Sequence, residues 1–256
     1  MKFSIITAVY NAEDTINRCV DSVLAQTNCL VEHIIVDGVS TDCTLEYLGQ
    51  YQDARLKVLS EPDSGIYDAW NKGVDMAQGD WLLFLGADDF LLASDVLQRV
   101  IEAARLDPAK RAFLSARLCV GPADGSAVVR ESGYGWGKIG NILNSPVLAM
   151  PAHGALFHSK GLFAGSRRFD ASYEASADKK LFFEEIGRSD IQYIDVQTTF
   201  FSMGGVTNRG GNKTRRWLEK RRLRQELGIP FLPRAYLRSL ASSVFNDILY
   251  FFRKKG

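Results

Sequence analysis

Cysteine and histidine are scarce in this sequence, and neither is spaced as a metal site or a disulfide framework would require. The four cysteines include no CxxC pair, and only three histidines occur among 256 residues. A zinc site is therefore disfavoured, and the cysteines are expected to be free thiols in a reducing compartment. The cysteines are Cys19, Cys29, Cys43 and Cys119, and the histidines are His33, His153 and His158.

Long apolar runs are also missing. No stretch of 18 apolar residues occurs, which disfavours a transmembrane helix. The first residues enter a short apolar strand instead of a signal-peptide pattern, so a cytoplasmic location is expected. Length and composition are those of a globular protein with one domain, or one domain with an appendage.

The net charge of +1 hides an uneven distribution. Residues 209–256 carry thirteen Lys or Arg and three Asp or Glu, whereas residues 1–208 hold 27 of the 30 acidic residues. An acidic body suits a site for a divalent cation, and a basic tail suits an anionic surface. We therefore expect a main domain at residues 1–212 and a basic helical tail at 213–256.

Strands and helices alternate along the first 90 residues. Short apolar runs bounded by polar turns are typical of buried strands, and apolar residues at helical spacing separate them. This succession predicts an α/β layer architecture with a mainly parallel sheet. Strands are expected at Phe3–Val9, Glu32–Asp37, Leu56–Ser60 and Asp80–Leu85, and helices at Ala12–Gln26, Thr41–Tyr51 and Gly65–Gln78.

After residue 90 the alternation is looser. A helix is expected over Ser94–Arg105 with Ser94 as its N-cap, and the four glycines within 133–140 indicate a loop. Further strands are expected at Ala112–Val120, Ala127–Glu131, Ala155–His158 and Ile191–Phe201, and further helices at Ala175–Ile186 and from Lys213 onward.

Polar residues follow each of the first four predicted strands. The carboxyl ends of parallel strands meet at one edge of a sheet, and ligands bind there. Singly, Asp37-Gly38 could be only a turn, and Asp88-Asp89 only a carboxylate pair at a helix start. Together the four ends predict a polar site for an anionic ligand and a metal. They are Tyr10-Asn11, Asp37-Gly38, Asp63-Ser64-Gly65 and Ala87-Asp88-Asp89.

Four segments carry a resemblance to a known family: Ser4–Asn11, Ile35–Asp42, Glu61–Gly73 and Gly79–Asp89. In combination they are far more specific than a lone glycine motif. Over about residues 2–208, and most strongly over 2–90, the chain resembles glycosyltransferase family 2, the inverting enzymes with a GT-A fold. The resemblance implies a Rossmann-like nucleotide-diphospho-sugar transferase fold with a mixed, mostly parallel sheet flanked by helices.

The resemblance also implies a donor site. A carboxylate such as Asp37 can accept hydrogen bonds from a base or a sugar hydroxyl, and Gly65 lets the backbone approach a ligand closely. Lys72 could equally belong to a solvated helix face. The residues implied in nucleotide and donor binding are Thr7, Val9, Tyr10, Asn11, Asp37, Ser40, Asp63, Gly65, Asp68, Asn71, Lys72, Ala87, Asp88, Asp89 and His153.

The acidic turn at residues 87–89 resembles the metal-binding motif of the family. Hard oxygen ligands suit Mg²⁺ or Mn²⁺, and such a cation offsets the charge that develops on a leaving nucleoside diphosphate. Position 86 is Gly where many relatives carry an acid. Asp88 is therefore the expected direct ligand, and Asp89 a supporting or sugar-contacting residue.

The segment Phe169–Asp178 resembles the part of the family that ends in the catalytic aspartate. The resemblance makes Asp178 the general base that takes the proton of the acceptor hydroxyl. One displacement assisted by one base implies inversion. Glu174 is the rival for this role, and Asp170 is expected to fix a turn.

Two further segments resemble parts of the family near the substrates. Within Pro151–Phe157, His153 would contact the diphosphate or the acceptor, with a purely structural histidine as the alternative. The segment Ser202–Thr207 would form a loop over the diphosphate, where Arg209 and Lys213 could pair with phosphate.

The tail combines basic residues with an apolar stripe at helical spacing. This pattern is typical of an amphipathic helix on an anionic membrane, although the stripe could instead pack on the main domain or on a second copy. Nucleic-acid binding is disfavoured because interleaved exposed aromatic residues are missing and the body is acidic. The stripe consists of Leu237, Leu240, Val244, Phe245, Ile248, Leu249 and Phe252.

These observations predict a metal-dependent inverting transferase. It would move a hexose from a nucleotide-sugar, with a UDP-sugar favoured, to a sugar or lipid-linked acceptor in bacterial polysaccharide or glycolipid assembly. A sugar nucleotidyltransferase would need a glycine-rich basic loop after the first strand, where Tyr10–Asp14 stands instead. The other alternative is a membrane-peripheral scaffold without turnover, against which Asp37, Asp88 and Asp178 argue.

Overall fold

The computed structural model describes residues 1–105, 107–132, 150–203 and 213–228. The strands are β1 (Lys2–Val9), β2 (Leu30–Asp37), β3 (Leu56–Ser60), β4 (Trp81–Phe84), β5 (Phe90–Leu91), β6 (Ala112–Pro122), β7 (Arg130–Ser132), β8 (Leu156–Ser159) and β9 (Asp190–Met203). The α-helices are α1 (Ile16–Leu24), α2 (Thr44–Leu48), α3 (Ile66–Met76), α4 (Val96–Ala103), α5 (Ala177–Glu185) and α6 (Lys213–Glu226). Two 3₁₀ turns flank β8, η2 (His153–Ala155) and η3 (Lys160–Phe163).

The described strands form one nine-stranded sheet in the order β3-β2-β1-β4-β8-β6-β9-β5, with β7 on β6. The four strands β1 to β4 are mutually parallel. β8 then runs antiparallel to both β4 and β6, whereas the long strands β6 and β9 are parallel to each other. The mixed, mostly parallel sheet predicted from the sequence is therefore confirmed, and β1, β4, β6 and β9 all end at the same edge.

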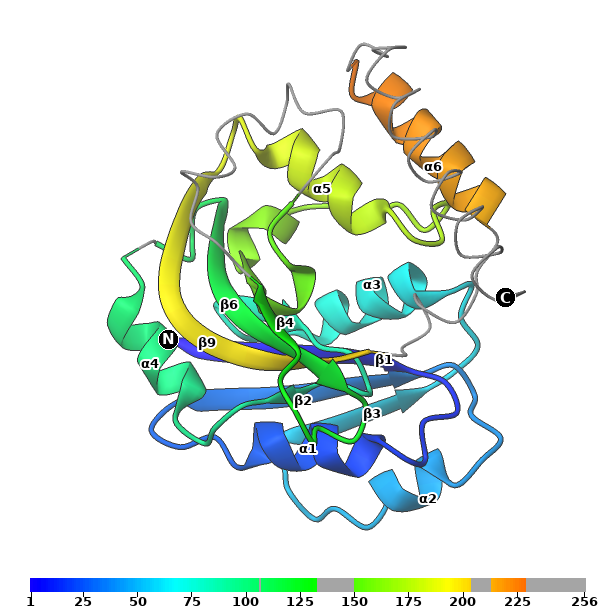
Figure 1. The fold of residues 1–256 in the computed structure, drawn as a ribbon, viewed down its shortest axis with the longest axis vertical. Coiled ribbons are helices and arrows are strands. Elements are labelled where there is room, and N and C mark those ends of the chain that lie inside the picture. Colours follow the sequence, from blue (N-terminus) through cyan, green and yellow to red (C-terminus); the bar gives the residue numbers. More distant parts are fainter. Residues whose placement is uncertain (106, 133–149, 204–212, 229–256) are drawn as a thin grey trace, which may run out of the picture.

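Alternating side chains of β1 fill two layers, because successive residues of a strand point to opposite faces. Phe3 and Ile5 pack with Cys19 and Val23 of α1. Ile6 packs on the other side with the apolar face of α3. Figure 1 shows α1 and α2 on one face of the sheet and α3 and α5 on the other. Each such side chain contributes about 1.5–3 kcal/mol when fully buried.

Helix α3 lies unusually close to the sheet. A Cβ atom at Gly73 would collide with the Cγ2 atom of Ile6, so the helix can approach β1 only with glycine there. This approach fixes the height of α3 above the sheet, and with it the position of the residues at its N-terminus.

Two predictions about local structure were wrong in detail, and one strand was not predicted. Ser94 does not cap α4, which begins at Val96 with Asp95 at the N-cap and without a side-chain capping bond. The strand expected at 127–131 is β7 at Arg130–Ser132. The two-residue strand β5 was not predicted, and it forms because Phe90 and Leu91 pair with the long strand β9.

Helix α6, the first part of the predicted tail, packs on the body of the protein. Leu223 is fully buried in the core cluster that contains Tyr173 and Phe182. The Arg222 guanidinium lies 4.2 Å above the ring centre of Tyr173, and Lys180 of α5 pairs with Glu226 at 2.6 Å. The glycine-rich loop at 133–140, Arg209 and the apolar stripe at 237–252 lie outside the described residues. Among the described helices, none is long and apolar enough to cross a membrane.

Candidate active site

The carboxyl edge of the sheet gathers most of the predicted site residues. β1 to β4 deliver their following loops to this edge because they are parallel. The end of β9 arrives there too, since the backbone N–H of Ser202 donates to Asp89 Oδ1 at 2.8 Å. Residues far apart in the sequence therefore lie together at this carboxyl edge, which we call the rim.

Asp37, the last residue of β2, has a fully buried side chain. Ser60 Oγ donates to its Oδ2 at 2.7 Å, and the backbone N–H of Ser40 donates to the same oxygen at 3.1 Å. The hydroxyl of Ser40 also donates to Oδ1. Ser60 lies opposite Asp37 because β2 and β3 are paired in that register. Asp37 thus orders the loop after β2 through Ser40, whose role in donor binding stays a prediction.

Asn11 connects the loop after β1 to the loop after β2. Its backbone N–H donates to Ser40 Oγ at 2.9 Å, and its Oδ1 accepts the backbone N–H of Thr41 at 2.8 Å. Asn11 has a positive φ of 51°, a conformation that asparagine adopts more readily than most residues. The neighbouring ring of Tyr10 is 62% exposed, so an aromatic face is presented beside this loop.

Thr7 and Val9 differ from their neighbours because their side chains point into the core. Thr7 is fully buried, and its hydroxyl lies 3.0 Å from Nε2 of His33. Val9 packs in the cluster around Ile16 and Ile35, against which Ala87 also packs. Only the backbone of these two strand residues can face a ligand at the rim, a consequence of the alternation in β1.

Asp63 and Asp68 shape the loop that leads into α3. Asp63 Oδ1 accepts the backbone N–H of Gly65 at 2.9 Å, and a Cβ at Gly38 would lie 2.7 Å from Asp63 Oδ2. Gly65 has a φ of 127°, which favours glycine. Asp68 accepts the backbone N–H of Ser64 at 2.9 Å. The loops after β2 and β3 therefore touch at Gly38.

Two predicted binding residues on α3 already have protein partners. Lys72 Nζ donates to the carbonyl of Pro62 at 2.6 Å and pairs with Glu61 at 2.9 Å. Asn71 exchanges two hydrogen bonds with the backbone of Phe169, at 2.8 and 2.9 Å. Through these contacts both side chains connect α3 to neighbouring segments of the protein. A ligand contact by either residue stays a prediction.

The acidic turn after β4 holds two different carboxyl groups. Asp89 is 4% exposed, and burial, followed by the charge of Asp88, raises its pKa to about 7. Asp88 is half-buried. A Cβ at Gly86 would lie 2.7 Å from the Asp89 carboxylate and 2.9 Å from that of Asp88. Glycine at this position therefore leaves room for both carboxylates to fold back over the turn.

The backbone of this turn is held from two sides. Arg18 of α1 donates from Nη2 to the carbonyl of Asp88 at 3.0 Å, and the hydroxyl of Ser202 donates to the same carbonyl. Among the described residues, no three His, Cys, Asp or Glu side chains converge as a complete metal-binding group. The chemistry of the turn suits a cation that takes most of its ligands from phosphate oxygens and water.

Asp178 stands in the first turn of α5, and its Oδ1 accepts a hydrogen bond from the hydroxyl of Tyr67 at 2.9 Å. Its rivals are placed differently. The side chain of Glu174 is exposed, and Asp170 binds Lys180 at 2.7 Å and the backbone N–H of Ser172 at 3.0 Å. The turn-fixing role expected for Asp170 agrees with these contacts.

His153 lies in an aromatic stack next to this pair. Its ring is 4.9 Å from that of Trp70 at an interplanar angle of 15°, and 5.6 Å from that of Phe84. Burial lowers the pKa of His153, partly offset by the charge of Asp178. Its buried Nε2 has no hydrogen-bond partner among the described residues. A neutral imidazole with one unused nitrogen is thus held near the proposed base.

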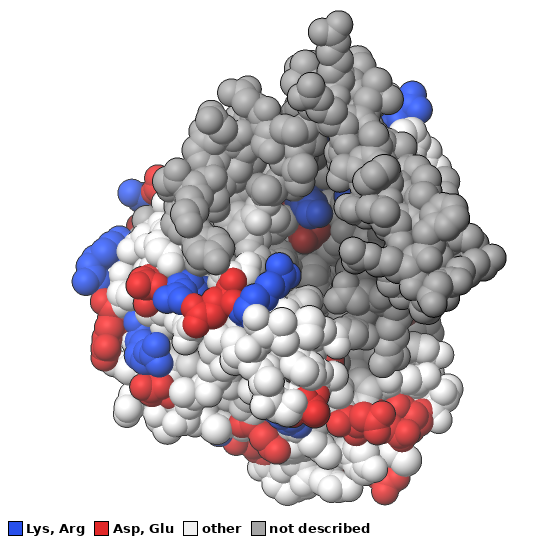
Figure 2. Space-filling model, in the orientation of Figure 1, with Lys and Arg blue, Asp and Glu red and all other residues white. Residues whose placement is uncertain are grey.

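Acidic side chains also gather outside the rim, over the corner of the molecule where α2 lies (Figure 2). There Glu13 Oε2 accepts the backbone N–H of Cys43 at 2.9 Å, and Asp42 Oδ2 accepts that of Glu13 at 3.1 Å. These carboxylates tie together the loops after β1 and β2, so they have a structural role.

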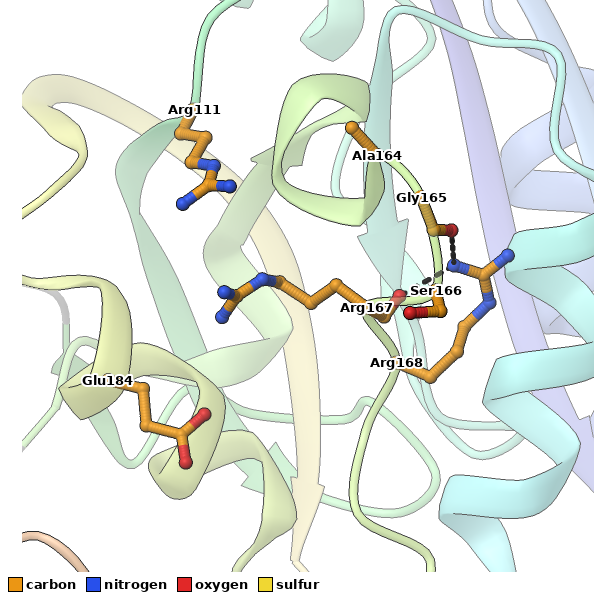
Figure 3. Close-up of a pocket in the computed structure, with 7 residues that line it drawn as sticks. All are labelled: Arg111, Ala164, Gly165, Ser166, Arg167, Arg168 and Glu184. Carbon is orange, nitrogen blue, oxygen red and sulfur yellow. Dashed lines mark hydrogen bonds between the residues drawn. The ribbon is translucent and has the colours of Figure 1, made fainter.

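A separate pocket lies at the opposite edge of the sheet, near the start of β6. Figure 3 shows Arg111 and Arg167 pointing into it from opposite sides, with Glu184 of α5 below. Arg167 pairs with the buried Glu185, from which Arg111 is 3.6 Å away. The pocket is distant from the carboxyl edge along the strands and includes no predicted site residue.

Four contributors to the site were not assigned individually from the sequence: Arg18, Ser60, Tyr67 and Ser202. Ser60 could have been found, because it ends the strand predicted beside Asp37. Arg18 lies 70 residues from its partner Asp88, and Tyr67 lies 111 residues from Asp178. No local pattern indicates pairs at such separations.

Comparison with known proteins identifies the class of protein that this fold and rim define. The family model described as Glycosyl transferase family 2 matches residues 4–163. The chain belongs to this family.

Two relatives show how far the likeness extends. The PGL/p-HBAD biosynthesis glycosyltransferase of Mycobacterium bovis is 34% identical over 179 residues, which are 69% of this chain and 66% of that protein. The uncharacterized glycosyltransferase EpsJ of Bacillus subtilis is 36% identical over 103 residues, 40% of this chain and 30% of EpsJ. The chain thus matches just under two thirds of the length of the mycobacterial relative.

Solved structures share the fold at low sequence identity. TarS 1–349 of S. aureus, in complex with UDP, has a TM-score of 0.60 and 20% identity, over 79% of this chain and 61% of TarS 1–349. The mannosyltransferase PcManGT of Pyrobaculum calidifontis, in complex with GDP-Man and Mn²⁺, has a TM-score of 0.55 and 19% identity, over 80% of this chain and 57% of PcManGT. The fold is GT-A, as predicted.

Proposed function

We propose that this protein is an inverting glycosyltransferase that moves a hexose from a nucleotide-sugar to a hydroxyl of a sugar or lipid-linked acceptor. A UDP-sugar is the favoured donor, and bacterial polysaccharide or glycolipid assembly is the setting. The observation that carries the proposal is the contact between Asp178 and Tyr67. This contact places the carboxylate of Asp178 beside α3, the helix that follows the loop after β3.

The donor side of the proposal rests on the loops after β1, β2 and β3. The exposed ring of Tyr10 can stack on a nucleobase, and the ordered loop around Asp37 offers acceptors for base or ribose. The N-terminus of α3 follows Gly65 and presents backbone N–H groups that suit a phosphate. TarS structures contain UDP or UDP-GlcNAc, which supports a nucleotide-sugar donor here.

The metal part of the proposal rests on Asp88, a half-buried carboxylate at the end of β4. Mg²⁺ or Mn²⁺ would be bound by Asp88 and by donor phosphate oxygens, with Asp89 holding the turn through Ser202. Bound there, the cation supplies charge stabilisation for the departing diphosphate. The PcManGT structure, which contains GDP-Man and Mn²⁺, supports a divalent cation beside the donor.

In the proposed reaction, Asp178 takes the proton of the acceptor hydroxyl as its oxygen attacks the anomeric carbon of the donor. The bond between that carbon and the phosphate oxygen breaks, and the electron pair leaves with the nucleoside diphosphate. The leaving group needs no protonating acid, so one carboxylate suffices. Attack opposite the leaving group inverts the anomeric centre.

A donor screen tests this proposal. Thermal unfolding is followed with Mn²⁺ and UDP-Glc, UDP-GlcNAc, UDP-Gal or GDP-Man, each at about 100 times the expected dissociation constant. One UDP-sugar should raise the melting temperature by about 5 °C, because a ligand at that ratio stabilises the folded state by about 2.7 kcal/mol. The corresponding sugar 1-phosphate without the nucleotide is the control and should give no shift.

Turnover then separates the alternatives. The proposal requires release of nucleoside diphosphate when acceptor saccharides or lipids are supplied with the stabilising donor. Formation of pyrophosphate from a sugar 1-phosphate and UTP would instead identify a nucleotidyltransferase. Stabilisation by a donor without any turnover would favour the scaffold.

A further inference from the structure

The hydroxyl of Tyr67 makes the closest described contact to the carboxylate of Asp178. It donates to Oδ1 at 2.9 Å, within the range of O–H···O hydrogen bonds. Tyr67 is 5% exposed. Its ring packs edge-on against Trp70 at 5.3 Å and lies 5.8 Å from the ring of Phe169. This packing restrains the ring of Tyr67 and keeps its hydroxyl directed toward Asp178.

Tyr67 is placed at the start of α3, two residues after Gly65. The same helical turn contains Asp68, which accepts the backbone N–H of Ser64. The loop proposed to hold the donor and the hydroxyl that reaches Asp178 therefore belong to one short, rigid unit. Asn71, one turn later, ties this unit to Phe169 by two hydrogen bonds, and so to the segment that leads into α5.

We infer that Tyr67 is a positioning residue for the proposed general base. Its hydrogen bond holds the Asp178 carboxylate in one orientation relative to the donor loop. This inference rests on the proposed function, since it gives Tyr67 a task only if Asp178 acts as the base.

The neighbours of the pair leave Tyr67 as the direct donor. His153, a neutral imidazole whose pKa responds to the charge of Asp178, comes from η2. Glu219, whose charge interacts with Tyr67, comes from α6 and accepts the backbone N–H of Ala175 at 3.1 Å. Neither group is altered when only the hydroxyl of Tyr67 is removed, so that change tests the contacts between this hydroxyl and Asp178.

Tyr67→Phe removes the hydroxyl and keeps the ring contacts. We expect kcat to fall about tenfold with KM for the donor within about twofold, because removing a hydrogen bond at the base alone affects the chemical step and leaves donor binding intact.

Tyr51→Phe is the matched control. The hydroxyl of Tyr51 also donates to an aspartate at 2.9 Å, to Oδ1 of Asp21 on α1, away from the rim. Its removal should leave kcat and KM unchanged. Comparison of the two variants cancels any general effect of losing a tyrosine–aspartate hydrogen bond.

The split between kcat and KM distinguishes positioning from structural damage. A folded Tyr67→Phe protein with wild-type kcat would overturn the inference, and so would a loss of activity that appears as a raised KM for the donor with unchanged kcat. Asp178→Asn is measured in parallel. If Asp178→Asn abolishes activity and Tyr67→Phe does not alter it, only this inference fails; if Asp178→Asn is fully active, the proposed function fails at its base.

Discussion

Replacing Asp178 with asparagine should lower kcat about 1,000-fold, within the range that a general base contributes. The amide keeps an oxygen that can accept the hydrogen bond from Tyr67, so the geometry at 2.9 Å need not change. What is lost is the ability to take a proton from the acceptor hydroxyl. The dissociation constant of the donor should stay within about twofold, because the donor loops do not depend on this charge. Steady-state kinetics and calorimetric donor binding measure the two quantities.

Glu174→Gln is the matched control, since it makes the same change in charge four residues away on an exposed side chain. Its kcat should stay within about twofold of wild type. A near-normal rate for Asp178→Asn would refute the assignment of the base. A collapse in Glu174→Gln instead would transfer that assignment to Glu174.

Lowering the pH from 7 to 5 should cost about 2 kcal/mol of stability through His33 alone. The imidazole is fully buried in β2 beside the hydroxyl of Thr7, and burial lowers its pKa to about 3. In the unfolded chain a histidine has a pKa near 6.5. Below that pH the unfolded chain binds the proton while the folded protein does not, so stability falls until the folded pKa is reached.

Other groups titrate in the same range, so the test is a difference between proteins. His158 is also buried, and its pKa is lowered with the same sign. Asp89, whose pKa is raised to about 7, acts in the opposite direction because its folded form takes up the proton first. Both contributions cancel when wild type is compared with His33→Gln, whose amide can still meet Thr7.

Urea unfolding of both proteins at pH 7 and pH 5 gives the result. His33→Gln should be the less stable protein at pH 7, and its deficit should shrink by about 2 kcal/mol at pH 5. A deficit that is equal at the two pH values would show that His33 is protonated as readily in the folded protein as in the unfolded chain. Tyr51→Phe, which has no titrating group in this range, should show a constant difference from wild type.

The part of the fold that the sequence predicts well is its parallel half. Each of β1, β2 and β3 is a short apolar run that ends in a turn, and the predicted ranges overlap the observed ones almost completely. β1 and β2 are visible in the sequence because both of their faces are buried, whereas β3 is a partly exposed edge strand. β5 has only two residues and no such pattern, and it forms by pairing with β9. Its existence depends on a tertiary contact.

In the candidate site, too, some features can be predicted from the sequence and others depend on tertiary contacts. Asp37, Asp63 and Asp88 could be placed at one edge because parallel strands share their direction. Side chains alternate between the two faces of β1, and this alternation can be read from the sequence. The inward orientation of the Thr7 side chain follows from it. The contacts of Tyr67 with Asp178 and of Ser202 with Asp89 join residues more than 100 positions apart, and such contacts arise only once the sheet is assembled.

The central claim is that the carboxyl edge of the sheet binds a nucleoside diphosphate together with a cation held by Asp88. Isothermal titration of UDP, with and without Mn²⁺, tests it in wild type, in Asp88→Asn and in Asp95→Asn, an aspartate whose nearest described ionic partner is Arg99. We expect Mn²⁺ to strengthen UDP binding about tenfold or more in wild type and in Asp95→Asn, and to have no effect in Asp88→Asn. UDP affinity that is the same with and without Mn²⁺ in all three proteins would contradict the account.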